Sequence, residues 1–317
     1  MKMEKIFNLE KIKSVLPKID LIKIIEEGFS EFSKGNVVVP PVGELIFENP
    51  PGDTHIKYGY IKNDDYYVIK IASGFYKNPE IGIPSGQGLM LVFCQKTGVL
   101  KAVLLDNGYL TDIRTAVAGA VAAKYMAPAN ISCIGIVGAG TQARYQLEYL
   151  KKVINCNKVL VWEQQGKPVK NYLDYFKKSD FKIDITNNIS DIGKNCNFIV
   201  TTTPSKKPLI MLEDIKPGTH ITAIGSDTAD KIELDTKIVS QADIVVVDSY
   251  EQSKSQGEIF RATQAGDINR SKLTELGNII NNKDLARQND KQITVTDLTG
   301  VAVQDIQIAK AVYELLK

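Results

Sequence analysis

The spacing of hydrophobic and polar positions changes twice along the chain. Apolar residues at Leu21, Ile25, Phe29 and Phe32 repeat at helical spacing, which predicts a helix within 19–34 that Asp20 caps and Gly35 ends. Between 37 and 105, short β-rich runs alternate with turn clusters, which predicts a mostly antiparallel sheet. The expected strands are 37–39, 55–61, 66–71, 88–94 and 99–105, and the expected turns are 50–53, 63–65, 84–86 and 96–98.

After Asp106 the pattern becomes one of apolar runs separated by helix-length segments. An Ala-rich helix is expected over 111–127, where Pro128 ends it. Continuous apolar runs separated by helices are typical of a parallel sheet covered on both faces, so the expected fold class is α/β, with a doubly wound parallel sheet after an α+β segment. The expected strands are 131–137, 158–162, 181–185, 198–202, 220–224, 244–247 and 293–295, and a last helix carries Ile306, Ala309, Tyr313 and Leu316.

Composition excludes several classes of protein. The 317 residues are 44% hydrophobic and 24% charged, which suits two globular domains. A formal net charge of +2 without a long basic block argues against nucleic-acid binding, and no apolar stretch approaches the ~18–20 residues of a membrane span. The charged start, Met1–Lys5, is unlike a signal peptide, so a cytoplasmic protein is expected.

Cysteine and histidine usage gives no sign of a metal site or a disulfide framework. The four cysteines are widely spaced, and the sequence has two histidines, His55 and His220, to join them. Cys94 and Cys133 stand in apolar runs and are expected to be buried, and His220 is expected to be a structural residue of a strand.

A glycine-rich motif, 138–143, follows the expected strand 131–137 and opens an expected helix. In this G-x-G-x-x-A pattern, Gly138 allows a tight turn, Gly140 lets a pyrophosphate approach the backbone, and Ala143 permits close helix packing. Glu163 ends the next strand, where an acid binds the ribose hydroxyls of NAD. Gln164 and Gln165 follow it instead of an arginine, so NAD(H) is favoured over NADP(H). The alternative is that the glycines only form a turn and Glu163 is a solvated loop acid.

Five segments in series resemble the ornithine cyclodeaminase/mu-crystallin family: 69–71, 111–116, 138–143, 225–235 and 300–305. Members of that family include ornithine cyclodeaminases, an archaeal-type alanine dehydrogenase, and reductases of cyclic or acyclic imino acids. The resemblance implies a Rossmann-type NAD-binding domain over 113–298, inserted in an α+β substrate-binding and dimerisation domain formed by 1–112 and 299–317. It also implies a homodimer.

The resemblance assigns roles to polar residues whose patterns alone leave them open. Arg114 would bind the substrate carboxylate, although it could instead form a surface ion pair with Asp112. Lys70 would lie at the reacting centre, although a strand lysine often points to solvent. Asp227 would transfer protons, although loop aspartates often serve only as turn residues. The expected catalytic residues are Asp227 and Lys70; the expected substrate-binding residues are Arg114, Lys70, Lys57, His55 and Thr299; the expected cofactor-binding residues are Ser85, Arg114, Thr115, Gly138, Gly140, Thr141, Gln142, Glu163, Thr202, Thr203, Ile224 and Lys231.

Departures from the family pattern bear on the substrate. Cyclodeaminases carry an arginine shortly after the proline that Pro41 matches, where Val42 and Gly43 stand here, and a glutamate at about the position of His55. Leu298 also stands where members often have serine. His55 and Lys57 alternate on one strand face. They either form a basic pair that replaces the missing arginine or receives a second acidic group of the substrate, or they face solvent.

These observations lead to one expected function and two alternatives. The expected function is NAD(H)-dependent hydride transfer at the α-carbon of a small amino or imino acid, by an imino-acid reductase or an amino-acid dehydrogenase. The first alternative is an ornithine cyclodeaminase, which forms proline and ammonia with catalytic NAD. The second is a non-catalytic, nucleotide-dependent protein that binds a small ligand; the presence of both Asp227 and Lys70 argues against it.

Overall fold

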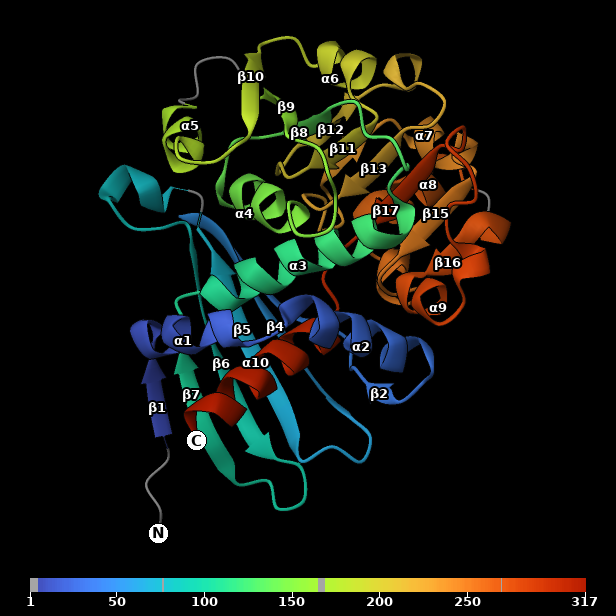
Figure 1. Ribbon diagram of the computed structural model, residues 1–317. Coiled ribbons are helices and arrows are strands. Elements are labelled where there is room, and N and C mark those ends of the chain that lie inside the picture. Colours follow the sequence, from blue (N-terminus) through green and yellow to red (C-terminus); the bar gives the residue numbers. More distant parts are fainter. Residues whose placement is uncertain (1–4, 76, 165–168, 269) are drawn as a thin grey trace. The chain divides into compact units, whose positions relative to one another are not determined.

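The computed structural model describes residues 5–75, 77–164, 169–268 and 270–317 (Figure 1). The chain divides into two compact units. Unit 1 is Met1–Arg114 with Val301–Lys317, and unit 2 is Thr115–Gly300. The domain boundaries expected from the sequence, after 112 and after 298, fall two residues before these.

Unit 1 is built on a seven-stranded sheet in the order β1-β7-β6-β5-β4-β2, with β3 paired to β4. The β1–β7 pair is parallel, and the remaining pairs are antiparallel. The strands are β1 (Lys5–Asn8), β2 (Val37–Val38), β3 (Gly43–Glu48), β4 (Pro51–Ile61), β5 (Tyr66–Gly74), β6 (Gly86–Cys94) and β7 (Leu100–Leu105).

Helices cover one face of this sheet. The C-terminal helix α10 (Ala302–Leu316) packs on β4, β5 and β6, flanked by α1 (Leu9–Val15) and α2 (Leu21–Ser33) (Figure 1). The expected ends of α2 are confirmed, since Asp20 accepts a hydrogen bond from the Lys23 N–H at 3.1 Å and Gly35 is left-handed with φ +76°. The helix α3 (Tyr109–Met126) starts in unit 1 and ends in unit 2.

Three expectations for unit 1 need correction. The strand β3 and the N-terminal β1 and α1 were not expected. Residues 51–53 are strand and not turn, because Glu48 of β3 pairs with Pro51 of β4 and leaves only Asn49 and Pro50 between the strands. Cys133 is buried as expected, whereas Cys94 is only partly buried.

Unit 2 contains an eight-stranded parallel sheet in the order β10-β9-β8-β11-β13-β17-β15-β16. The order reverses between β8 and β11, which is the switch point where open α/β sheets bind ligands. The strands are β8 (Ile134–Val137), β9 (Lys158–Trp162), β10 (Lys182–Thr186), β11 (Phe198–Thr201), β13 (His220–Ala223), β15 (Ile244–Val247), β16 (Leu273–Glu275) and β17 (Thr294–Asp297). A separate pair, β12 (Lys206–Ile210) and β14 (Ile232–Leu234), was not expected, nor was β16.

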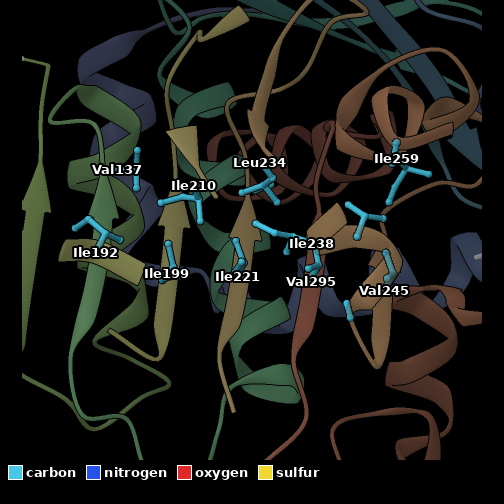
Figure 2. Close-up of a cluster of buried hydrophobic side chains, with 14 of the residues drawn as sticks. Val137, Ile192, Ile199, Ile210, Ile221, Leu234, Ile238, Val245, Ile259 and Val295 are labelled. Atoms are coloured by element: carbon cyan, nitrogen blue, oxygen red, sulfur yellow. The ribbon is translucent and has the colours of Figure 1, made fainter. Parts of the chain in front are cut away.

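Both faces of the central strands β8, β11, β13 and β17 are buried, as their continuous apolar runs predict, whereas the edge strand β10 is largely exposed. Figure 2 shows Ile199, Ile221 and Val295 of the sheet packed with Ile238 and Ile259 from two helices. Their strand neighbours, such as Val200 and Thr296, are equally buried on the opposite face, so the expected Rossmann-type α/β class is confirmed. Besides the part of α3 from Thr115 onward, the described α-helices of unit 2 are α4 (Thr141–Leu150), α5 (Lys170–Phe176), α6 (Ser190–Asn195), α7 (Thr236–Gln241), α8 (Gly257–Ala265) and α9 (Leu276–Asn281). Within the described ranges, no helix is long and apolar enough to cross a membrane.

Candidate functional site

The glycine-rich loop of unit 2 joins β8 to α4. Gly138 has φ +100°, a conformation that side chains disfavour, and its N–H donates to the Trp162 carbonyl at 2.8 Å. Gly140 is the N-cap residue of α4, and a Cβ placed there would meet no atom within 4 Å. As a glycine, Gly140 has no side chain to cap the helix, and the open space around it among the described residues leaves the first N–H groups an approach suited to a phosphate.

Glu163 lies beside this loop. Its Oε2 accepts a hydrogen bond from the Ala139 N–H at 2.8 Å, and its Oε1 accepts one from the Gln164 N–H at 2.9 Å. The fold therefore brings Glu163, at the end of β9, to the glycine-rich loop at the end of the neighbouring strand β8. A carboxylate at this point favours ribose hydroxyls and repels a 2′-phosphate. Gln165 lies outside the described residues.

The loop after β11 touches the same glycine. Thr202 donates to the Val137 carbonyl from both its N–H and its hydroxyl at 3.0 Å, and a Cβ on Gly138 would come within 3.0 Å of the Thr202 hydroxyl. Thr203 follows, and Ile224, just past β13, donates its N–H to the Thr201 carbonyl at 3.0 Å. These three expected cofactor residues thus meet at neighbouring strand ends.

Three other expected cofactor residues lie near α4. The Thr115 carbonyl accepts a hydrogen bond from Gln146 Nε2 at 3.1 Å. The Thr141 hydroxyl accepts one from Arg144 at 3.2 Å, and Gln142 follows in the first turn of the helix.

Asp227 lies in the loop after β13, where its carboxylate pairs with the Lys231 ammonium at 2.6 Å. The Asp227 side chain is 47% exposed, whereas that of Lys231 is 11% exposed. A half-exposed carboxylate with one fixed cation can exchange protons with a ligand or water. Thr299 is deeply buried, and its hydroxyl donates to Asp248 at 3.0 Å and accepts from Gln252 at 2.8 Å.

Unit 1 holds two buried lysines side by side. The β4–β5 register sets Lys57 directly opposite Lys70, and their exposures are 7% and 2%. Because both lysines are buried, the alternatives in which they face solvent are wrong. Like charges opposite each other on one sheet face destabilise that face unless anions balance them.

Arg114 is also buried, and it is linked to Lys70 through one carboxylate of α10. Its Nε donates to Asp305 Oδ1 at 2.9 Å and its Nη1 donates to Gln304 Oε1 at 2.9 Å. The other Asp305 oxygen lies 3.8 Å from Lys70 Nζ. Arg114 is thus not the surface ion pair with Asp112 that the pattern left open.

Sequence reasoning gave no role to Asp305 or Gln304, although both belong to a segment that carries the family resemblance. Two polar residues between Val303 and Ile306 of an apolar helix were the available signal. Gln304 Nε2 is buried, and it has no hydrogen-bond partner within the part of the chain that the structure describes. An amide donor left in this state beside a guanidinium suits a ligand oxygen.

The remaining expected residues of unit 1 are less deeply buried. His55 Nε2 lies 3.5 Å from Asp53, and Nδ1 lies 3.9 Å from Glu44, so its ring is placed between two carboxylates. Ser85 precedes β6, and its carbonyl accepts a hydrogen bond from the Phe75 N–H at 2.9 Å. Asp106, which was not among the expected site residues, is by contrast deeply buried; it accepts a hydrogen bond from the Leu110 N–H at 2.7 Å, and burial raises the pKa of this carboxyl.

His220 is structural, as expected. Its two ring nitrogens hydrogen-bond with Thr294 at 2.8 Å and Thr222 at 2.9 Å, and burial lowers its pKa well below 6.5. In the described ranges, no cluster of three or more histidine, cysteine or carboxylate side chains is suited to a metal ion.

The fold and the glycine-rich loop define a Rossmann-type α/β protein. The chain belongs to the ornithine cyclodeaminase/mu-crystallin family, whose profile matches residues 3–317, and the expected family is confirmed.

Named relatives include both redox enzymes and a cyclodeaminase. An uncharacterized cyclodeaminase of Sinorhizobium fredii is 36% identical over 314 residues, covering 98% of this chain and 95% of the relative. An alanine dehydrogenase of Archaeoglobus fulgidus is 36% identical, with coverage of 98% and 94%. An iminosuccinate reductase of Paracoccus denitrificans is 34% identical over 252 residues, with coverage of 79% and 78%.

Three solved structures share the whole fold. An archaeal alanine dehydrogenase dimer with bound NAD matches with a TM-score of 0.89 at 34% identity, covering 98% of this chain and 95% of its own. The Thermococcus litoralis Δ1-pyrroline-2-carboxylate reductase, with NADH and L-proline, has a TM-score of 0.91 at 27% identity and coverage of 98% and 96%. The P. denitrificans iminosuccinate reductase with NAD⁺ has a TM-score of 0.88 at 29% identity and the same coverage.

Proposed function

We propose that the protein is an NAD(H)-dependent oxidoreductase that transfers hydride at the α-carbon of a small amino or imino acid. The observation that carries this proposal is the charge buried in unit 1. Among its described residues, the buried charged side chains are three cations, Lys57, Lys70 and Arg114, and two carboxylates, Asp106 and Asp305. The basic side chains outnumber the carboxylates, so a carboxylate anion from a ligand would balance the buried charge.

Arg114 and Lys70 would bind the substrate carboxylate. Asp305 and Gln304 already engage the Nε and Nη1 groups of Arg114, so the carboxylate would use the Nη2 side of the guanidinium. Fixing the carboxylate sets the position of the α-carbon next to it.

Unit 2 suits NAD(H) and supplies the proton-transfer group. The loop with Gly138 and Gly140 would hold the pyrophosphate, and Glu163 would hold the ribose. NAD(H), when bound, supplies or accepts the hydride. Asp227, oriented by Lys231, would deliver a proton to the substrate nitrogen or take one from water.

A cyclodeaminase is the second candidate, favoured by the S. fredii relative. Against it stand Gly43 and His55, at or near positions where the family's cyclodeaminases carry an arginine and a glutamate. His55 lies near two carboxylates, a setting unlike that of a glutamate that orients an amine. We therefore favour net reduction or dehydrogenation.

A paired assay separates the two candidates. Nicotinamide absorbance and ammonia are followed together with ornithine, lysine, alanine, keto acids plus ammonia, and cyclic imino acids. Net NADH change with a substrate supports the proposal. Ammonia and proline from ornithine without net NADH change would establish the cyclodeaminase instead, and inertness toward all of them, with NADH still bound, would favour a binding protein.

The role of Arg114 has its own test. Arg114→Lys keeps the charge but loses the forked geometry, so we expect KM for the carboxylate substrate to rise by about tenfold while the NADH Kd stays constant. Arg287→Lys is the matched control, since Arg287 is a partly buried arginine that binds backbone carbonyls in unit 2. An unchanged KM in Arg114→Lys would remove Arg114 from the substrate site.

We also propose a homodimer, formed through the sheet face of unit 1 opposite α10. The register aligns Tyr58, Ile69, Leu91 and Val103 in one apolar row on that face, and Tyr58 remains 37% exposed. Sedimentation of Leu91→Glu should give a monomer. Leu315→Glu, a change at an exposed leucine of α10, should leave the dimer intact. A monomeric parent protein would refute this proposal.

A cytoplasmic location, where NAD(H) is plentiful, completes the proposed function and is tested by cell fractionation.

A further inference from the structure

Glu233 on β14 is fully buried, and its carboxylate accepts hydrogen bonds from two different loops. Its Oε2 accepts hydrogen bonds from the Thr201 hydroxyl at 2.7 Å and the Gly225 N–H at 2.9 Å. Its Oε1 accepts from the Thr203 N–H at 2.6 Å and the Thr203 hydroxyl at 2.7 Å. The first loop leaves β11 and the second leaves β13, and these strands are neighbours in the sheet.

The two loops carry residues of the proposed site. Thr202 lies between two of the donors and is bonded to the Val137 carbonyl beside the glycine-rich loop. Asp227 follows Gly225 by two residues. The loops also touch each other directly, because a Cβ on Gly225 would lie 2.1 Å from the Thr203 carbonyl oxygen. The loop that carries the expected cofactor residues Thr202 and Thr203 is therefore in direct contact with the loop that carries Asp227.

We propose that Glu233 is a positioning residue, whose carboxylate fixes the cofactor loop and the Asp227 loop in one arrangement. This inference rests on the proposed function, and Glu233 acts through the loops without contact with the substrate. A carboxylate is required, since each oxygen accepts a backbone N–H. Either orientation of a glutamine amide would set its NH₂ group against one of those N–H groups.

A second buried glutamate, Glu258 of α8, lies against the backbone of β14 and is a chemical match for Glu233. Glu258 is also buried, and its two oxygens accept the backbone N–H groups of Glu233 at 2.7 Å and Leu234 at 3.3 Å. Glu258 therefore accepts hydrogen bonds from the backbone of β14, that of Glu233 included, and among the described residues from neither loop. Replacing either glutamate by glutamine disturbs a buried carboxylate with backbone donors, while only one of the two replacements releases the loops.

The experiment compares full-length Glu233→Gln and Glu258→Gln with the parent protein. NADH Kd is measured by fluorescence titration, and unfolding midpoints are measured in parallel. We expect Glu233→Gln to weaken NADH binding by about tenfold or more, and Glu258→Gln to change it less than about threefold at a similar loss of stability. Equal weakening in both variants, or none in Glu233→Gln, overturns the inference.

A milder pair of variants covers the case in which Glu233→Gln does not fold. Thr201→Val removes one of the four donors to Glu233 with little change in shape and none in charge, so NADH binding should weaken by about threefold. Thr201→Ser keeps the hydroxyl, so this variant should bind NADH as the parent protein does. Failure of the serine to restore binding would contradict the role of the hydroxyl. If the parent protein does not bind NADH, the proposed function fails and this inference fails with it; a parent that binds NADH and is unaffected by these changes refutes the inference alone.

Discussion

Asp305 balances two buried cations, so replacing it by asparagine tests the electrostatics of unit 1. Its oxygens lie 2.9 Å from Arg114 Nε and 3.8 Å from Lys70 Nζ, and the exposures of the three side chains are 1%, 5% and 3%. Asparagine has nearly the same shape and still offers an oxygen to Arg114. The change therefore removes chiefly the negative charge.

The distances set the size of the effect. At an effective dielectric constant of about 20, Coulomb attraction is about 6 kcal/mol at the Arg114 distance and about 4 kcal/mol at the Lys70 distance. Much of this attraction offsets the cost of removing the charges from water. Deleting one partner of a buried pair leaves the other charge unbalanced and costs about 3–5 kcal/mol. We expect Asp305→Asn to lower the free energy of unfolding of unit 1 by about 4 kcal/mol.

Urea unfolding followed by circular dichroism measures this loss. Asp64→Asn is the matched control, because Asp64 pairs with Lys310 of the same helix, α10, whose side chain is 32% exposed. The Asp64 side chain is 14% exposed, so water screens this pair more than it screens the Asp305 group, and we expect Asp64→Asn to cost about 1 kcal/mol. If Asp305→Asn destabilises the protein no more than Asp64→Asn does, the buried cations are not balanced by Asp305 and the reasoning is wrong.

Three further predictions concern unit 2. Glu163→Ser should narrow the difference between NADH and NADPH affinity, because it removes a charge that repels the 2′-phosphate; an unchanged Kd ratio would refute that role. Asp227→Asn should lower kcat by about 10²–10⁴-fold while NADH Kd changes less than twofold, and retained turnover would exclude proton transfer by Asp227. Burial raises the pKa of Glu233 from 4.5 to about 7, so the folded state binds more protons than the unfolded state between these values, and stability relative to Glu233→Gln should fall by roughly 3 kcal/mol as pH rises through this window. A pH-independent difference in urea unfolding between these two proteins would contradict the last prediction.

Local patterns were sufficient for the elements whose sequence matches their surroundings. The helix α2 has a capping aspartate and a glycine stop, and the central strands of the parallel sheet are apolar because both their faces are buried. The strand β3 was not predicted because its apolar residues Leu45, Ile46 and Phe47 form a continuous, exposed run without the alternation of a half-buried strand. The short strand β14 was not predicted because charged Lys231 precedes it and Glu233 interrupts its apolar pattern; both residues are buried by tertiary contacts.

The sequence by itself determined the class of fold, the glycine-rich loop and the identity of most candidate residues, because these depend on periodicity and on motifs only a few residues long. Only the tertiary structure decided which charges meet. Arg114 and Asp305 are 191 positions apart, and Glu233 joins loops from two different strands. Buried ion pairs and hydrogen-bond networks arise from strand order and register, which bring distant residues within 3–4 Å. The sequence around a lysine or a glutamate does not identify the residue that will pair with it in the fold, and only that pairing makes burial of its charge possible.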